Sequence, residues 1–391
     1  MIGRKQIVIL GCLLMIGLAG LCGCGSPSSD SMERVGTDAD HAADVPGGLT
    51  YESSMELQYA KNFSVDDYEG GYKILKTMDG TQILVVPEEK EVPDGISKDV
   101  VVVKQPVKNL YVVSSSIMDI FSKLDAMDTI RLSSQKEEDW YVQDAKDAME
   151  RGDILYAGKY SKPDYELIVS ENCSLAIENT MITHSPEVSE MLADFDIPTM
   201  IEYSSYESHP LGRVEWVKFF GALIGKDELA QKIFNEEVRL VDEVTSVEKT
   251  DKTVAFFYVT SNGLIQVRSS SDYVPKMINL AGGNYIPTNI GDPDSKRSTV
   301  SMQIEDFYDQ AKDVDFIIYN SSIDGGIGSV QELLDKCAVL KDFKAVKEGN
   351  VWCTTNDMYQ QSMSIGYLIR DMHAMLQEKD QDDMTYLFHV E

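Results

Sequence analysis

The feature that most constrains the fold of this chain is an alternation of short apolar runs with amphipathic runs, which begins near Tyr111. Runs such as TIRLSS, DILYAGK and SLAIEN have the length and composition of strands. Four apolar residues before the first of these runs are spaced like one face of a helix, namely Ile117, Ile120, Phe121 and Leu124. Regular alternation of this kind predicts an α/β fold with a mainly parallel sheet flanked by helices.

A long run without proline interrupts this alternation between residues 214 and 247. Its apolar residues keep helical spacing throughout, and Gly221 and Gly225 are its only weak points. A helix of about 30 residues would be about 45 Å long. A second alternation starts at TVAFFYV and ends in the helical pattern QSMSIGYLIRDMHAML. The sequence therefore predicts two α/β lobes joined by one long α-helix, with boundaries at 107–212, 213–248 and 249–391.

The segment over residues 49–106 has a β pattern of its own. Asp79 and Gly80 lie between two strand-like runs, and this dipeptide is a strong signal for a β-hairpin because both residues tolerate a positive φ. Two further short strands are predicted on either side of Pro106. We therefore expect an N-terminal β-hairpin addition to the α/β fold, and the sequence assigns it no function.

The N-terminus combines a basic head with an apolar run that ends in LCGC. Arg4 and Lys5 precede this run, which falls short of the roughly 20 residues that a membrane-spanning helix needs. The pattern is typical of a secretory signal peptide. Its exit resembles the lipobox of bacterial lipoproteins, whose cysteine is diacylated and becomes the new N-terminus. We therefore expect a lipoprotein signal peptide over residues 1–23 and lipidation at Cys24, with an uncleaved anchor or a plain secretory signal as the alternatives.

Residues 24–48 are mostly Ser, Asp, Gly, Ala and Pro. Such a segment cannot bury enough apolar surface to offset the entropy lost on ordering, so we expect a disordered tether. Together with the lipid, this tether would hold the protein at the cell membrane on its extracytoplasmic face. The formal net charge of -30 argues against a nucleic-acid partner, because a polyanion would be repelled.

The cysteines and histidines show no pattern of a metal site. Cys173, Cys337 and Cys353 follow the predicted anchor without a CxxC pair, so we expect three buried free thiols, with a bridge between the last two left open. The five histidines form no HExxH pair and are scattered along the chain, at His41, His184, His209, His373 and His389. A transition-metal-ion binding protein would need several of them to converge in the fold.

Catalytic motifs are also missing from the sequence. The glycine-rich run DGGIGS lacks the GK[ST] ending of a phosphate-binding loop, and no GxSxG run is present. We therefore expect neither catalysis nor a cofactor. A hydrolase-like enzyme whose residues meet in a cleft of the same scaffold is the alternative.

Six segments in succession carry a family resemblance, and they cover roughly residues 109–376. They are VVSSSIMDIFSKLDAMDTIRLSS, YAGKYSKPDYELIVSENCSLAI, IPTMIEYSS with the following GRVEWVKFFGALIGKDELA, YVPKMINLAGGNYI, DVDFIIYN and FKAVKEGNVW. In this order they resemble the substrate-binding proteins of bacterial ABC importers for iron–siderophores, haem and cobalamin. The resemblance implies two Rossmann-like lobes joined by a rigid helix, a ligand in the cleft between the lobes, and delivery to a membrane permease. It leaves the choice between siderophore, haem and corrinoid open.

Candidate ligand-binding residues follow from the rule that α/β sheets bind ligands at the carboxyl ends of their strands. Arginine suits an anionic chelate because its guanidinium binds two oxygens at once. The serines before the first predicted helix offer hydroxyls beside free backbone N–H groups, and Ser116 with Asp119 has the spacing of a capping box. The residues expected to bind the ligand are Ser115, Lys159, Tyr160, Tyr203, Tyr206, Arg213, Arg268 and Tyr359.

The resemblance also implies one surface glutamate per lobe that pairs with arginines of the permease. SKPDYELI supplies Glu166 at the matching place in the first lobe. VSMQIEDFYDQAKDVDFII supplies Glu305 in the second, where Gln303 and Asp306 are close enough to take the same role.

Overall fold

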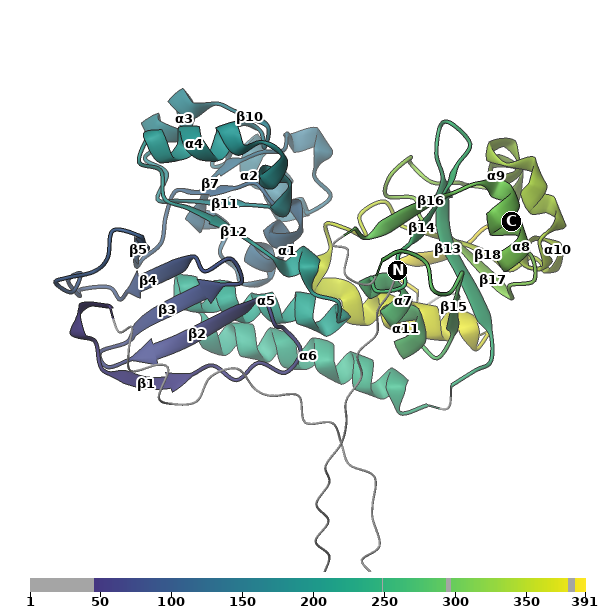
Figure 1. Cartoon of the computed structure of the whole chain (residues 1–391), viewed down its shortest axis with the longest axis horizontal. Coiled ribbons are helices and arrows are strands. Elements are labelled where there is room, and N and C mark those ends of the chain that lie inside the picture. The colour runs from purple at the N-terminus through teal and green to yellow at the C-terminus, as the bar shows by residue number, and fades with distance from the viewer. Residues whose placement is uncertain (1–45, 248, 293–296, 379–383) are drawn as a thin grey trace, which may run out of the picture. The chain divides into compact units, whose positions relative to one another are not determined.

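The computed structural model of the protein describes residues 46–247, 249–292, 297–378 and 384–391 (Figure 1). The predicted signal peptide, Cys24 and most of the predicted tether lie outside the described residues. The last three residues of that segment form a 3₁₀ turn, η1 (Pro46–Gly48). A Cβ atom on Gly47 would lie 2.7 Å from the Cβ atom of Pro93, so this turn packs closely against the segment around Pro93.

The N-terminal segment forms a five-stranded sheet in the order β1-β2-β3-β4-β5, which is more than the predicted hairpin (Figure 1). Its strands are β1 (Tyr51–Ser54), β2 (Phe63–Tyr68), β3 (Tyr72–Thr77), β4 (Gln82–Val86) and β5 (Val100–Lys104). The first four are antiparallel, and β5 pairs with β4 in parallel. The predicted hairpin turn is confirmed between β3 and β4, where Gly80 has a φ of 89°.

This N-terminal sheet shares its core with the rest of the described chain. The ring of Phe63 lies 4.9 Å from the ring of Trp216 and 5.4 Å from that of Phe219, measured between centroids. All three side chains are buried, and the two partners of Phe63 lie on a helix more than 140 residues further along the chain. The sheet is therefore a packed part of the fold.

Two α/β sheets follow, as the alternation predicts. The first has the order β12-β11-β6-β7-β8 and is parallel throughout. Its strands are β6 (Leu110–Val112), β7 (Ile130–Ser133), β8 (Leu155–Tyr156), β11 (Leu175–Glu178) and β12 (Thr199–Ile201). Its helices are α1 (Ser115–Lys123), α2 (Gln143–Glu150), α3 (Tyr165–Ser170) and α4 (Pro186–Asp194), and a small hairpin is formed by β9 (Gly158–Lys159) and β10 (Lys162–Pro163).

The second α/β sheet is mixed, with the order β16-β14-β13-β17-β18-β19 and β15 paired with β13. Its central pairs β13–β17 and β17–β18 are parallel, whereas β14, β16 and β19 join antiparallel. The strands are β13 (Thr253–Val259), β14 (Ile265–Arg268), β15 (Asn284–Ile286), β16 (Thr299–Met302), β17 (Phe316–Tyr319), β18 (Val351–Thr354) and β19 (Leu387–His389). The helices are α7 (Tyr273–Leu280), α8 (Ile304–Ala311), α9 (Val330–Lys336), α10 (Lys344–Glu348) and α11 (Ile365–Leu376).

The prediction of one long helix over residues 213–248 is wrong. The chain forms two helices, α5 (Pro210–Ile224) and α6 (Asp227–Thr245), which run side by side (Figure 1). Gly225 ends α5 with a φ of 76°, a left-handed conformation that favours glycine because other residues carry a Cβ atom. A Cβ atom on Gly221 would lie 2.5 Å from that of Ala230, so this glycine lets the two helices approach closely.

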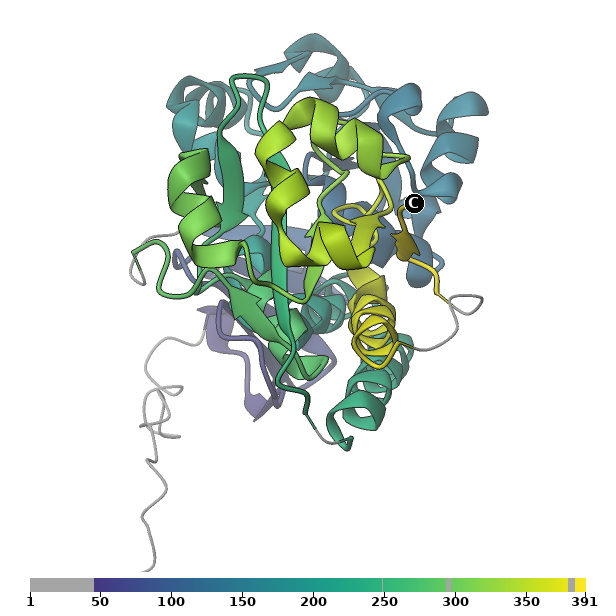
Figure 2. The same ribbon diagram turned by 90° about the vertical axis from the view of Figure 1, so that its right-hand side faces the viewer.

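α5 is buried over nearly its whole length, because it packs between several neighbours. α6 is amphipathic and packs against α11, the last helix that the structure describes (Figure 2). Short 3₁₀ turns complete the described elements, at η2 (Met127–Thr129), η3 (Glu137–Asp139), η4 (Thr180–His184), η5 (Ser204–Tyr206), η6 (Ala338–Asp342) and η7 (Ser362–Ser364). Within the described residues, no helix is both long enough and apolar enough to cross a membrane.

Candidate ligand-binding cavity

A cavity lies where the chain around η7 meets α1, η5 and α5. Its volume is about 30 Å³, and because one water needs roughly 10–15 Å³ it has room for about two. More of its lining residues are serines and tyrosines than apolar residues. The lining residues are Ser116, Ile120, Ser204, Arg213, Tyr273, Met358, Tyr359, Gln361, Ser362, Ser364, Ile365, Leu368 and Tyr386.

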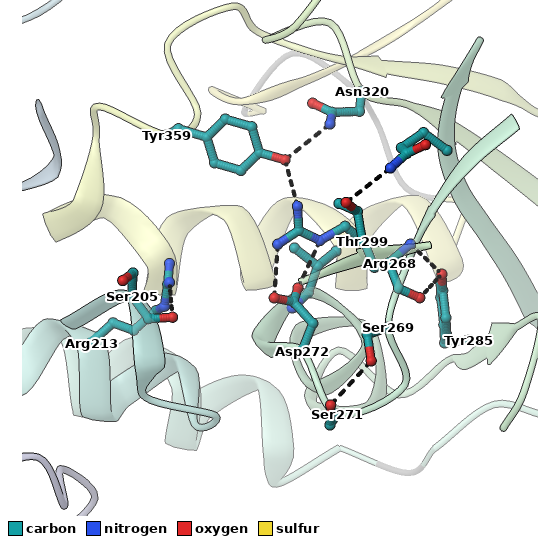
Figure 3. A network of polar contacts seen from close by, with 12 residues as sticks. Ser205, Arg213, Arg268, Ser269, Ser271, Asp272, Tyr285, Thr299, Asn320 and Tyr359 are labelled. Atoms are coloured by element: carbon teal, nitrogen blue, oxygen red, sulfur yellow. Dashed lines mark hydrogen bonds and ion pairs between the residues drawn. The ribbon is translucent and has the colours of Figure 1, made fainter. Parts of the chain in front are cut away.

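Arg213 is the cation of this cavity and lies in the first turn of α5 (Figure 3). Its guanidinium carbon lies 3.8 Å from the centre of the Tyr273 ring, a cation–π contact. Its Nη2 donates to the carbonyl oxygen of Ser205 at 2.8 Å. Its Nε is buried and has no hydrogen-bond partner within the described part of the chain. An unsatisfied buried donor is unfavourable, so a further acceptor within reach of Nε would stabilise Arg213.

Arg268 lies behind the cavity and does not line it. Its Nε and Nη2 donate to the two carboxylate oxygens of Asp272, each at 2.8 Å, and the residue is only 7% exposed (Figure 3). This two-point contact is the strong form of an arginine–carboxylate pair. Its Nη1 donates to the hydroxyl of Tyr359 at 3.2 Å, so Arg268 positions a residue of the cavity wall.

Tyr359 extends this network to the cavity. Its hydroxyl oxygen accepts from Arg268 and also from Nδ2 of Asn320 at 2.9 Å (Figure 3). A phenolic oxygen has two acceptor positions and one O–H donor, so its own proton is left to donate. Arg213 and Tyr359 therefore present two donors to the same space.

Direct hydrogen bonds close one side of the cavity. Ser362 Oγ donates to the carbonyl oxygen of Ser116 at 2.5 Å, and the N–H of Met363 donates to Asp119 at 2.8 Å. The side-chain nitrogen of Gln360 donates to the carbonyl oxygen of Asp139 at 2.9 Å. The side-chain oxygen of Gln360 accepts the N–H of Tyr141 at 2.8 Å. These bonds join the segment before α11 to α1 and η3, next to the cavity.

Asp119 therefore has a different role from the predicted capping box. Ser114 is the N-cap of α1 and makes no side-chain cap bond, and the carboxylate of Asp119 accepts the distant Met363 N–H. Burial raises the pKa of Asp119 to about 6, although that hydrogen bond opposes the shift. On the other side of the same segment, Glu237 of α6 accepts the N–H of Gly366 at 2.7 Å. Burial raises the pKa of Glu237 to about 7.

The structure brings two of the eight predicted ligand-binding residues to the cavity, Arg213 and Tyr359. Ser115 is half-buried at the start of α1, beside Ser116, which does line the cavity. Lys159 is exposed in the β9–β10 hairpin. Tyr160 follows it and packs on the core of the first α/β sheet.

The two tyrosines after β12 lie together, with ring centroids 5.6 Å apart. Tyr203 is buried, and its hydroxyl donates to Asp79 of the N-terminal sheet at 3.2 Å. Tyr206 is half-buried against the same core. Neither residue lines the cavity.

Sequence reasoning missed most of the cavity's hydroxyls. Gln361, Ser362 and Ser364 precede α11 directly, and the polar run QQSMS before a helix was the available signal. Tyr273 directly follows the N-cap of α7, and its role depends on contact with the distant Arg213. No local pattern marks that contact.

Both predicted docking glutamates are exposed. Glu166 lies in the first turn of α3 and Glu305 in the first turn of α8. Asp306 is also exposed, next to Glu305. Each sheet therefore carries a carboxylate on a flanking helix.

The cysteines and histidines of the described chain do not converge. No group of three or more His, Cys, Asp or Glu side chains among these residues is arranged to hold a metal ion. Cys353 is buried and Cys173 and Cys337 are half-buried, all as free thiols, so the possible Cys337–Cys353 bridge is not formed. His41 lies outside the described residues.

Two curated relatives align with nearly the whole chain, and no protein-family model matches it. An uncharacterized lipoprotein of Methanocaldococcus jannaschii is 22% identical over 91% of this chain and 89% of its own length. A second uncharacterized lipoprotein of that organism is 23% identical over 99% of this chain and 100% of its own.

Solved structures show the same architecture. An ABC transporter substrate-binding protein from Listeria monocytogenes superposes with a TM-score of 0.52 at 18% identity, covering 70% of this chain and 100% of that one. A periplasmic haem-binding protein of Vibrio cholerae gives a TM-score of 0.55 at 13% identity, with 67% and 97% covered. The periplasmic vitamin B12 binding protein of Vibrio cholerae gives 0.50 at 15% identity, with 70% and 98% covered.

All three are named as binding proteins. These structures cover 67% to 70% of this chain, so about a third of it lies outside each match. The chain has the fold of the ABC-transporter substrate-binding proteins, which is the family that its sequence resembles.

Proposed function

We propose that this protein is an extracytoplasmic substrate-binding lipoprotein that captures a small ligand at the cavity beside Arg213 and delivers it to an ABC importer. One observation carries the proposal: Arg213, whose buried Nε has no hydrogen-bond partner within the described chain, lines a cavity between α1, η5, α5, α7 and the segment before α11. The segments 107–212 and 249–391 would act as Rossmann-like lobes, with α5 and α6 as their rigid connection in place of one helix.

The chemistry of the cavity favours a ligand with anionic oxygens. Arg213 and Tyr359 both present donors, and several serine hydroxyls stand around them. An iron–siderophore, haem or a corrinoid each carries oxygen acceptors, and each is far larger than a cavity of about 30 Å³. We propose that such a ligand enters when the bonds of Gln360, Ser362 and Met363 to the first α/β sheet open.

Titration of the purified full chain with a ferric siderophore, haem and cobalamin tests this function, read from visible absorption. Arg213→Gln is expected to lower the affinity for the ligand roughly 10- to 100-fold, because a charge-assisted hydrogen bond contributes about 1.5–3 kcal/mol to binding. Arg239→Gln, which changes an exposed arginine of α6, is the matched control and should bind like the parent. Saturable binding of none of the three ligands, or equal affinity in the Arg213 variant, contradicts the proposal.

We propose lipid anchoring through Cys24, which the lipoprotein names of both relatives support. Cys24→Ala should abolish incorporation of a labelled fatty acid and release the protein from the membrane fraction of cells that express it. Cys173→Ala is the control that keeps the anchor. Undiminished labelling of the Cys24 variant excludes this residue as the lipidation site.

We propose that Glu166 and Glu305 pair with arginines of the permease, and the exposure of both residues supports this role. The double variant Glu166→Arg with Glu305→Arg should keep its ligand affinity while ligand uptake by cells falls several-fold, since charge complementarity governs encounter. Glu190→Arg with Glu348→Arg places the same charge change on other exposed helix positions. Equal uptake by the two double variants would rule out the pair.

A further inference from the structure

A second and larger hollow lies between the N-terminal segment, the start of α5 and the start of α7. Its volume is about 380 Å³, and it shares no lining residue with the cavity beside Arg213. Nearly every residue around it is polar, and lysines face it from two sides, Lys61 from the β1–β2 connection and Lys276 from α7.

The wall that carries Lys61 is fixed by buried carboxylates. The backbone N–H groups of residues 58–62 donate in succession to Glu215 and Glu207 at distances of 2.8 to 3.1 Å. Both glutamates are buried, at 0% and 4% exposure. Within this segment, the ring of Tyr59 stacks on His209 with centroids 4.5 Å apart. Five consecutive amides on buried acids leave the backbone of this connection little freedom, so the Cα atom of Lys61 has a fixed place beside the hollow.

The charge facing the hollow is positive. Neither Lys61 nor Lys276 forms an ion pair with another residue that the structure describes, whereas many of the other lysines do. Asp272 is the one acid in the lining, and both of its oxygens are already bound by Arg268. Lys61 and Lys276 are therefore two lysines without an acidic partner among the described residues, in a chain with a net charge of -30.

The hollow also offers neutral hydrogen-bond donors. His209 Nδ1 accepts the N–H of Leu211 at 3.2 Å, which places the ring proton on Nε2. Burial, with further contributions from Lys276 and Lys61, lowers the pKa of His209 to about 4, so the imidazole stays neutral at pH 7. Ser270 accepts the N–H of Ile290 through its Oγ at 2.9 Å and keeps its own proton to donate.

We propose that this hollow is a second binding site, specific for a small oxyanion that carries a phosphate or carboxylate group, held between Lys61 and Lys276. Ionised acceptors make the strongest hydrogen bonds with ammonium groups. Because Glu207 and Glu215 already hold the backbone that carries Lys61, only the side chain has to be ordered when the anion binds. The site assigns a role to the N-terminal sheet, because one of its connections supplies half of the charge.

Isothermal titration of the full chain in mild detergent tests the site, with inorganic phosphate and citrate as separate probes in a chloride buffer of low ionic strength. The parent should bind at least one of them, and the preferred probe tells phosphate from carboxylate recognition. Lys61→Gln with Lys276→Gln should weaken that binding at least tenfold. Both lysines are exposed, so thermal denaturation should confirm that this variant folds.

Lys232→Gln with Lys341→Gln is the matched control, because both are exposed lysines away from the hollow and the change in net charge is the same. It should bind like the parent. If both double variants weaken binding equally, the loss comes from the change in net charge alone and the proposal is overturned. Failure of the parent to bind either probe at millimolar concentration would also overturn it.

Discussion

Alanine in place of Glu215 is expected to lower the free energy of unfolding by about 3–5 kcal/mol, the usual result when one partner of a buried ion pair is removed. Glu215 is fully buried, accepts three successive backbone N–H groups from residues 58–60, and holds the ammonium of Lys218 at 2.9 Å. The variant removes the acceptor of three backbone N–H groups and the carboxylate partner of the buried Lys218. Because whole domains are stable by only about 5–15 kcal/mol, such a loss brings the protein close to unfolding.

Urea denaturation followed by tryptophan fluorescence measures this change, since Trp216 lies beside Glu215 on α5. Glu236→Ala is the control, because Glu236 is an exposed glutamate whose partner Arg239 stays in solvent, and its midpoint should match that of the parent. Glu215→Gln should fall between the two, because an amide oxygen still accepts hydrogen bonds. An alanine variant as stable as the parent would mean that the N-terminal sheet is not held by this carboxylate.

Glu178→Gln is expected to stabilise the protein at neutral pH and to leave its stability unchanged near pH 4. Glu178 ends β11 with 0% exposure, and neither of its carboxyl oxygens has a hydrogen-bond partner within the described chain. Burial among apolar side chains raises its pKa from 4.5 to about 8. The folded protein therefore keeps a proton on this carboxyl group that the unfolded chain releases.

The sign of the effect follows from this difference in bound protons. The contribution of the protonated Glu178 to the free energy of unfolding is fully present below pH 4.5. It falls by about 1.4 kcal/mol per pH unit as the pH rises, and it stops falling near pH 8. At pH 7 the loss amounts to about 3 kcal/mol, and glutamine removes it because it does not ionise. Urea denaturation of both proteins between pH 4 and pH 8 should give curves that diverge with increasing pH. Parallel curves, like those expected for the exposed control Glu190→Gln, would contradict the assignment of a raised pKa to Glu178.

Local signals in the sequence were enough to predict the two α/β sheets and the turn at Asp79 and Gly80, because hydrophobic period and turn chemistry depend on near neighbours. The hydrophobic period did not reveal that α5 and α6 are two separate helices. Gly225, Lys226 and Asp227 interrupt no apolar stripe, so a sharp turn and a continuous helix have the same pattern there.

The choice between two arginines in the candidate site shows a similar limit. Arg268 lies at the end of a strand, as a ligand-binding residue should, yet Asp272 four residues later binds its guanidinium. Arg213 reaches the cavity through its stacking on Tyr273, which lies 60 positions further along the chain. The i, i+4 spacing of Arg268 and Asp272 could have been recognised in the sequence, whereas the long-range contact of Arg213 could not.

The bonds from residues 58–62 to Glu207 and Glu215 also constrain the order in which the protein can fold. They join positions 145 to 157 apart in the chain, and contacts of such separation form late because a long loop must close first. Until Glu207 and Glu215 are in place, the five neighbouring amides of the β1–β2 connection lack these acceptors. The connection between β1 and β2 is thus among the last parts to be completed, and a fragment that ends before Glu207 contains the five strands but neither of the acids that order this connection.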